Sequence, residues 1–201
     1  MQALLHPTPV SASAGLAPAP AFGFAGAGAG ASPPALQMLE ATQPDSRTLR
    51  SCLGQMATGV TVIATRAADG TLLGLTANSF SALSLDPPLI VWSMRLASSS
   101  LPVFQAAPRF VVNILAEAQT DISRRFASQT EDKFDGVAYA LNEHQLPLLH
   151  SAAAWFECRT MSQQTVGDHC LFVAQVERCT SSEAAPLLFH AGGYYGLGSR
   201  L

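Results

Sequence analysis

The stretch GLTANSFSALSLDPPLIVWSMRLASSS, Gly74–Ser100, carries the strongest structural signal in this chain. Small polar residues open it, Asp86-Pro87-Pro88 turns the chain, and an apolar strand over Leu89–Trp92 leads to a second group of hydroxyls. Small side chains let a planar ligand approach backbone N–H and C=O groups, and hydroxyls suit a phosphate. The stretch therefore indicates a groove for a flat, phosphorylated molecule. A strand–turn–strand unit whose Ser and Thr side chains face water is the alternative.

Upstream of this stretch the sequence predicts a helix and a β-hairpin. The helix is capped by Asp45 or Ser46 and ends at Gly59. Its apolar residues recur at i, i+3, i+4 and i+7, namely Leu49, Cys52, Leu53 and Met56. The hairpin follows, with Val60–Thr65 alternating in the manner of a strand and an Asp-Gly turn leading into Leu72–Ala77.

Downstream, the pattern predicts further strands and two short helices. Ser100 caps the first helix, and the second runs from Thr120 or Asp121 through Phe126. The strands are expected at Ser79–Leu85, Leu89–Met94, Phe110–Leu115, Ala153–Gln163, His169–Cys179 and Leu187–Tyr195. Many strands, a few short helices and Gly/Pro turns predict a mainly β fold, a small β-barrel.

Residues 1–44 differ in composition from the rest of the chain. Ala, Gly, Pro and Ser dominate this segment, and no Lys or Arg precedes Arg47. Ordering a residue costs about 1–2 kcal/mol of backbone entropy, which such small side chains bury too little surface to offset. We therefore expect a disordered tail over 1–44 and one folded domain over 45–201. The segment lacks the charged start of a signal peptide and is too broken by Pro and Gly to span a membrane.

The composition excludes several classes of function. The chain of 201 residues has a formal net charge of -3 and a single lysine, Lys133, so nucleic acid is not expected as a partner. The 4 cysteines show no C-x-x-C pair and no histidine at zinc spacing. We expect reduced, mostly buried thiols in a cytoplasmic protein, with no metal site and no membrane contact.

The familiar motifs of catalysis and nucleotide binding are missing from the sequence. There is no G-x-S-x-G elbow, no Walker loop, and no G-x-G-x-x-G after a predicted strand. The absence of these motifs fits a protein in which a cofactor supplies the chemistry while the chain supplies orientation and electrostatics.

Several segments, in order along the chain, resemble the flavin reductase-like family. They are GVTVIAT (Gly59–Thr65), GLTANSFSALSLDPP (Gly74–Pro88), SLPVF (Ser100–Phe104), FVVNILAEAQ (Phe110–Gln119), SRRFAS (Ser123–Ser128), EDKFDGV (Glu131–Val137) and GDH (Gly167–His169). The resemblance covers roughly Ser46 to the C-terminus. The tail before Asp45 has no counterpart in it, and the serine-rich loop Ala97–Ser100 is looser than the usual form.

The resemblance implies an FMN-binding split β-barrel that forms a homodimer with flavin at or near the subunit interface. It also implies hydride transfer from NADH or NADPH to FMN or FAD, with reduced flavin supplied to a partner oxygenase. One alternative is a flavin-binding redox carrier or sensor of the same fold without free-flavin turnover. Two others are a barrel enzyme that holds its flavin permanently and a pyridoxamine phosphate oxidase-like enzyme, for which the chain has few basic residues.

Two groups of residues are predicted to hold the flavin. For the ring edge these are Thr76, Ala77, Asn78 and Ser79, and for the phosphate Ser98, Ser100, Ser123, Arg124 and Arg125. Ser93, Phe126 and Tyr195 complete the expected contacts. The resemblance supports the Thr76–Ser79 run, the serines after the Trp92 strand and the SRRFA segment. The arginines follow the predicted helix start, where free amides also favour an anion, and a solvated helix face is their alternative.

His169 is the predicted catalytic residue. It matches the GDH turn of the family, whose histidine lines the nicotinamide side. The nicotinamide must lie within about 3–3.5 Å of the flavin for transfer. A turn histidine without a role is the alternative. Tyr194 and Tyr195 either cover the ring or pack at the dimer contact.

Overall fold

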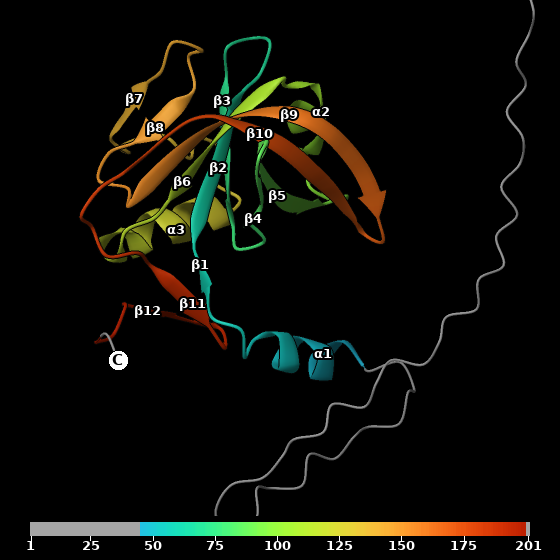
Figure 1. The fold of residues 1–201 in the computed structure, drawn as a ribbon, viewed down its shortest axis with the longest axis vertical. Helices are drawn as coiled ribbons and strands as arrows, with labels where there is room; N and C mark the ends of the chain where they lie inside the picture. The colour runs from blue at the N-terminus through green and yellow to red at the C-terminus, as the bar shows by residue number, and fades with distance from the viewer. Residues whose placement is uncertain (1–44, 200–201) are drawn as a thin grey trace, which may run out of the picture. The chain divides into compact units, whose positions relative to one another are not determined.

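A seven-stranded antiparallel sheet, curved into a barrel, dominates the computed structural model, which describes residues 45–199 (Figure 1). The strand order is β3-β2-β6-β9-β10-β5-β4. Their bounds are β2 Thr61–Arg66, β3 Leu72–Ala77, β4 Ser81–Leu85, β5 Pro88–Arg95, β6 Arg109–Ile114, β9 Ala154–Val166 and β10 His169–Ser181. The edge strands β3 and β4 are consecutive in the chain, so residues 78–80 cross from one edge to the other. We call this crossing the seam. Because β3 and β4 are the two edges of the sheet, the barrel is open between them, which is the split barrel that was predicted.

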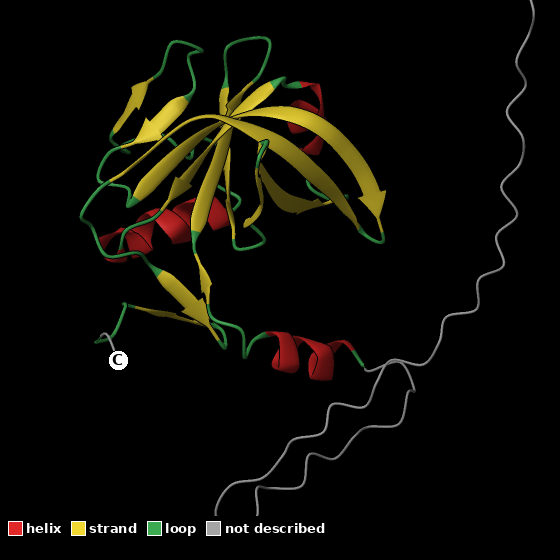
Figure 2. Cartoon of the chain, in the orientation of Figure 1, coloured by secondary structure: helices red, strands yellow, loops and turns green. Residues whose placement is uncertain are grey.

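Smaller elements surround the sheet (Figure 2). The helices are α1 Ser46–Leu53, α2 Leu101–Ala106, the 3-10 turn η1 Glu117–Gln119 and α3 Thr120–Ala127. The short strands are β1 Thr58–Gly59, β7 Tyr139–Leu141, β8 Pro147–Leu149, β11 Leu188–His190 and β12 Gly193–Tyr195. β7 pairs with β8, and β11 pairs with both β1 and β12. The predicted tail over 1–44 lies outside the described residues.

The barrel interior is filled by aromatic rings around Trp92. Its ring stacks on Phe172 at 4.5 Å between centroids and meets the edges of Phe104 and Phe110 at 5.4 and 5.6 Å. All four side chains are buried. Such rings bury large areas and add about 0.5–1.5 kcal/mol per favourable pair, so this cluster stabilises the packing inside the barrel.

A second apolar cluster lies on the outer face of β2 and β6. Val62 and Val111 pack there with Leu149 of β8 and with Phe126 of α3. Because both faces of these strands are covered, Thr61–Thr65 is buried at every position. The predicted alternation of Val60–Thr65 is therefore wrong, and the run is typical of a strand covered on both faces.

Two predicted boundaries are also wrong. The first helix begins after Asp45, whose carboxylate accepts the backbone N–H groups of Arg47 and Thr48, but it ends at Leu53 rather than Gly59. The predicted strand Leu187–Tyr195 is two strands, because the chain turns between β11 and β12 with positive φ at Ala191 and Gly192.

All four cysteines are free thiols, but only two of them are buried, whereas most were predicted to be. Cys158 and Cys170 are buried, whereas Cys52 and Cys179 are exposed. Burial raises the pKa of Cys158 to about 12, which keeps this thiol protonated at neutral pH. Within residues 45–199, no helix has the length and apolar character needed to cross a bilayer, and no group of three or more His, Cys, Asp or Glu side chains is placed to bind a metal.

Candidate functional site

Helix α3 lies close against strand β3 because Gly74 has no side chain. A Cβ built on Gly74 would lie 2.6 Å from Cε1 of Phe126 and 3.2 Å from Cζ of Phe134. Phe126, a predicted flavin contact, is 1% exposed, and its ring meets the edge of Phe134 at 4.9 Å. The structure therefore places Phe126 in the outer core, where it positions α3 on β3.

This close packing brings together the two segments that the sequence assigned to the flavin. Thr76 Oγ1 donates a hydrogen bond of 2.6 Å to the backbone carbonyl of Ser123. The Ser123 side chain is fully buried, and its Oγ lies 2.8 Å from the hydroxyl oxygen of Tyr194. Strand β3, helix α3 and strand β12 thus meet at the end of β3 that leads into the seam.

Tyr194 is a residue of this junction that the sequence did not single out from its neighbour. Besides its contact with Ser123, its ring lies below the Arg124 guanidinium, 5.7 Å from centroid to Cζ. Tyr195, the predicted contact, is 53% exposed and lies against the His190 ring at 5.9 Å. Adjacent residues of a strand face opposite sides of the sheet. The choice between Tyr194 and Tyr195 therefore depends on which side of β12 faces α3, and the sequence does not show this.

The two arginines of α3 have different surroundings. Arg125 Nε donates to the Lys133 carbonyl at 2.9 Å, and Arg125 also lies 3.8 Å from Asp135. The Arg124 side chain is 67% exposed, and its one ion pair among residues 45–199 is a 3.7 Å contact with the exposed Asp121 carboxylate. Both lie in the last turn of α3, so the free amides of the helix start are not beside them, contrary to expectation. Arg124 is the better placed of the two to meet an anion from solvent.

Lys133 is a basic residue of this region for which the sequence predicted no role. Its ammonium donates a hydrogen bond of 2.9 Å to the carbonyl of Phe126, at the end of α3. Partial burial lowers the pKa of this lysine. The carbonyls at a helix C-terminus favour a cation, so Lys133 helps to fix the loop over 131–135 against the helix.

Ser79 and Ser93 hold the seam in place. Ser79 Oγ donates to the Ser93 carbonyl at 2.9 Å and accepts the Ser93 N–H at 3.1 Å. The neighbouring Ala77 carbonyl accepts the Thr61 hydroxyl at 2.7 Å. Asn78 is exposed between these two anchors. The predicted run Thr76–Ser79 is therefore fixed at both ends with its middle open to solvent.

Ser98 and Ser100 lie on the connection between β5 and α2. Their carbonyls accept N–H groups of the first turn of α2, and Ser100 is its N-cap without a side-chain cap bond. In the described part of the chain, no hydrogen bond links either serine to the segment Ser123–Arg125.

His169 begins β10 on the strand that pairs with β5. It lies opposite Arg95. Ser93, which pairs with Leu171, lies two positions away, a distance of about 7 Å along the strands. The Nδ1 of His169 lies 2.7 Å from Oδ1 of Asp168, and the hydrogen bond with His169 lowers the pKa of that carboxyl. The histidine is thus oriented by its neighbour, with Nε2 left for another partner.

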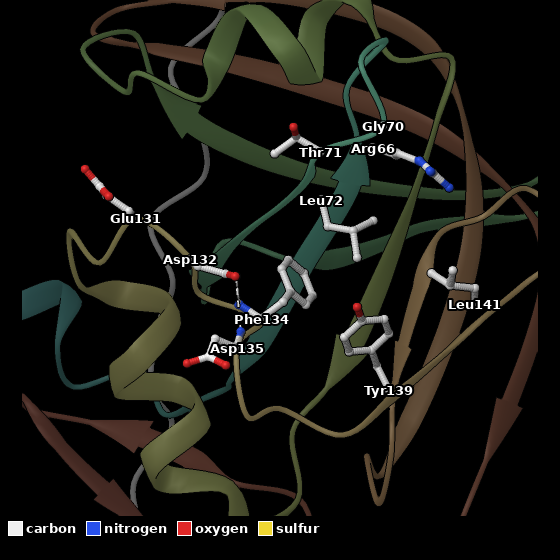
Figure 3. A pocket seen from close by; sticks show the side chains of 10 residues that line it. All are labelled: Arg66, Gly70, Thr71, Leu72, Glu131, Asp132, Phe134, Asp135, Tyr139 and Leu141. Carbon is white, nitrogen blue, oxygen red and sulfur yellow. Dashed lines mark hydrogen bonds between the residues drawn. The ribbon is translucent and has the colours of Figure 1, made fainter.

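The two cavities described in this structure lie elsewhere. The larger, about 650 Å³, lies between the β2–β3 turn, the loop over 131–135 and β7, with Leu72, Phe134 and Tyr139 among its lining residues (Figure 3). The smaller, about 280 Å³, lies beside Arg66 and Arg109. None of the predicted flavin contacts lines either of these two cavities.

Comparison with known sequences identifies close relatives. The reductase component of a flavin-dependent trigonelline monooxygenase from Acinetobacter baylyi is 43% identical over 149 residues, which make up 74% of this chain and 48% of that protein. This chain thus spans about half the length of that relative. A flavin reductase from Pseudomonas putida is 38% identical, over 76% of this chain and 90% of that one.

Solved structures agree with these matches. The flavin reductase PheA2 in its native state superposes with a TM-score of 0.72 at 36% identity, over 78% of this chain and 100% of PheA2. The NADH:FAD oxidoreductase SgcE6 of Streptomyces globisporus, in complex with NAD and FAD fragments, gives 0.73 at 32% identity, covering 77% and 93% of the two chains. A model of the family described as "Flavin reductase like domain" matches residues 53–198. Since that match includes most of the described residues and the whole barrel, the chain belongs to the flavin reductase-like family.

Proposed function

We propose that this chain is an NAD(P)H-dependent flavin reductase that transfers hydride from a nicotinamide to FMN or FAD and supplies the reduced flavin to a partner monooxygenase. The observation that carries the proposal is the contact between Thr76 and Ser123, which joins the two segments assigned to the flavin. The relatives named above are flavin reductases or reductase components of monooxygenases. The reaction class follows from family membership, and the residue roles are inferred from the geometry.

The groups around the seam fit a flavin. The backbone of residues 78–80 takes no part in the strand pairing on either side, so its N–H and C=O groups are free to bind a ring edge. Arg124 presents an exposed guanidinium, which forms strong charge-assisted bonds with phosphate. A bound flavin supplies the hydride-accepting chemistry, and the side chains of this surface bind it and orient it.

Replacing His169 by alanine is expected to raise the KM for the nicotinamide nucleotide roughly tenfold, because one hydrogen bond to a charged or polar partner is lost. The KM for flavin should change by less. Initial rates of NADH or NADPH oxidation at varied concentrations of each substrate measure both constants. His144→Ala is the matched control, since His144 is equally exposed (37% against 39%) and also neighbours a carboxylate. Equal effects on the two constants would remove His169 from the nicotinamide site.

Turnover with free flavin tests the proposed activity against a flavin carrier or sensor. Purified protein is mixed with NADH or NADPH and excess FMN or FAD, and nicotinamide oxidation is followed at 340 nm. We expect rapid oxidation whose rate scales with the concentration of added flavin. Tight flavin binding without nicotinamide oxidation would falsify the reductase and favour the carrier.

We also propose that two copies of the chain pair and that flavin binds near their contact. Helix α1 buries none of its own residues, and Leu53 and Met56 are 65% and 74% exposed, while Leu85 of β4 is 92% exposed. Figure 1 shows α1 projecting from the barrel beside β11 and β12. An amphipathic helix with an exposed apolar face gains stability by burying that face, which a second copy would allow.

The change Leu53→Glu is expected to convert the dimer into monomer, because it places a charge in the apolar contact. Sedimentation velocity of both proteins measures the change in mass. Arg50→Glu, an exposed position of the same helix, is the control that should leave the dimer intact. Sedimentation of the unaltered protein as a monomer would contradict the proposal directly.

A further inference from the structure

A small cavity lies at the end of β2 away from the seam. Arg66 pairs with Leu72 at this end, whereas Thr61 pairs with Ala77 at the seam end, about 16 Å along the strand. The volume is about 280 Å³, and the lining includes three basic side chains, Arg66, Arg109 and His144, and no carboxylate. The cavity is therefore separate from the proposed flavin surface and carries an excess of positive groups.

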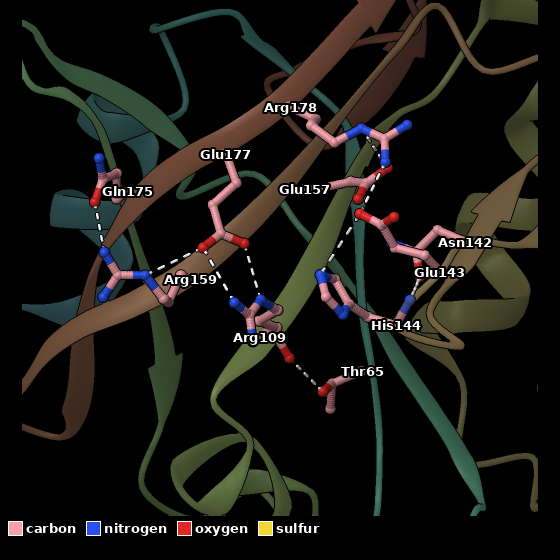
Figure 4. Close-up of polar contacts among 10 residues, drawn as sticks. All are labelled: Thr65, Arg109, Asn142, Glu143, His144, Glu157, Arg159, Gln175, Glu177 and Arg178. Carbon is pink, nitrogen blue, oxygen red and sulfur yellow. Dashed lines mark hydrogen bonds and ion pairs between the residues drawn. The ribbon is translucent and has the colours of Figure 1, made fainter.

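Arg109 is oriented by a carboxylate that it shares with another arginine. Its Nε and Nη2 lie 2.8 and 3.3 Å from the two oxygens of Glu177, and Arg159 Nε lies 3.1 Å from the same carboxylate (Figure 4). Two guanidinium groups thus face one carboxylate, which leaves this cluster with one net positive charge. Because these bonds use Nε and Nη2 of Arg109, its Nη1 is left for another acceptor.

The other two basic groups are held by the tip of the β7–β8 hairpin. Arg66 Nη1 donates to the side-chain oxygen of Gln145 at 3.3 Å, a neutral partner, and Arg66 also lines the larger cavity with Glu131, Asp132 and Asp135. His144 Nε2 lies 3.9 Å from Glu143, but that carboxylate also pairs with Arg178 at 3.0 Å. Of the two arginines that line the cavity, Arg109 is paired with Glu177, whereas Arg66 forms no ion pair among residues 45–199, so the lining keeps a net positive charge.

We propose that this cavity binds a small oxyanion, namely a phosphate group. Guanidinium groups match phosphate geometry with two parallel N–H···O bonds, and side chains already held by neighbours lose little freedom when they bind. The volume falls just below the range of about 300–1,000 Å³ that is typical of sites for drug-sized ligands. The occupant is thus a free phosphate or the phosphate end of a larger molecule, rather than a whole dinucleotide.

Calorimetric titration of inorganic phosphate into the full-length protein tests this site. The protein is first saturated with FMN, so that a phosphate site at the seam is filled, and sodium chloride keeps the ionic strength constant. We expect saturable binding that weakens at least tenfold in Arg66→Gln, because a charge-assisted bond contributes about 1.5–3 kcal/mol. His144→Gln provides a second variant that should also weaken binding, should Arg66→Gln fail to fold.

Arg47→Gln is the matched control, because it removes the same charge from an exposed position that does not line the cavity. It should leave phosphate affinity within about twofold, as expected for a screened surface charge. Equal weakening of phosphate binding by Arg47→Gln and Arg66→Gln would overturn the site. So would a heat of phosphate binding no larger than the heat of adding chloride. Titration with AMP in place of phosphate distinguishes a free phosphate from the phosphate end of a larger molecule. AMP should bind as tightly as phosphate only if the cavity accepts a phosphate that is attached to a larger molecule. Reductase turnover of Arg66→Gln should be unchanged, so this site and the proposed activity can fail independently.

Discussion

Gly74→Ala is expected to lower the free energy of unfolding by about 1–3 kcal/mol and to weaken flavin binding. The added Cβ would lie 2.6 and 2.8 Å from two carbons of the Phe126 ring, which is itself buried against Phe134. The ring is already packed against Phe134, so we expect the close contact to push α3 away from β3. That movement separates Ser123 from Thr76 and thereby disrupts the junction on which flavin binding is proposed to depend.

Gly59→Ala provides the control for this change. Gly59 also lies in a strand, β1, but a Cβ built there has no atom within 4 Å, so alanine is accommodated without displacement. Urea unfolding gives the stability difference, and quenching of flavin fluorescence gives the affinity. Combining Gly74→Ala with Phe126→Leu should recover part of the lost stability, because the smaller side chain leaves room for the methyl group. Equal stability of the two alanine variants would show that α3 is not held by this contact.

Asn113→Ala is expected to destabilise the fold by roughly 3 kcal/mol or more, because each buried group left without its partner costs about 1–3 kcal/mol. Asn113 is fully buried on β6. Its amide nitrogen donates to the carbonyls of Val62 at 3.2 Å and Pro147 at 3.4 Å, and its oxygen accepts the Leu149 N–H at 2.8 Å. One side chain thus ties the β7–β8 hairpin to the sheet.

Thr65→Val is the comparison for Asn113→Ala. Thr65 is also fully buried, but its hydroxyl makes one hydrogen bond, a 2.8 Å contact with the Arg109 carbonyl. The loss should be about 1 kcal/mol. Urea midpoints at unchanged m-values measure both effects, and hydrogen exchange of the β8 amides should quicken only in Asn113→Ala. If Asn113→Ala costs no more than Thr65→Val, the hairpin is held mainly by apolar packing.

Elements governed by local signals could be predicted from the sequence. The turn at Asp69-Gly70 joins β2 and β3 as expected, with positive φ at Gly70, and Gly167 turns β9 into β10 in the same way. Asp45 caps α1 through its own neighbours. Each of these features depends on residues only a few positions apart, so the pattern was sufficient to indicate it.

Elements stabilised by distant contacts could not be predicted in this way. The β7–β8 hairpin was missed because its short strands are held by Asn113, about 35 positions away, rather than by a strong pattern of their own. The continuous burial of Thr61–Thr65 depends on α3 and β8 covering the outer face. The length of α1 was overestimated because its apolar spacing continues to Met56, whereas the helix itself stops at Leu53.

The amino-acid sequence alone determined the class of fold and the segments that form the proposed site, because strand patterns, turn residues and family motifs are properties of neighbouring residues. Only the tertiary structure decided how those segments meet: Thr76 reaches Ser123 across 47 positions, and Ser123 reaches Tyr194 across 71. It also separated Arg124, which remains exposed, from Arg125, which is bound to the loop over 131–135. Burial and hydrogen-bond partners are set by residues far apart in the chain, and no local pattern records them.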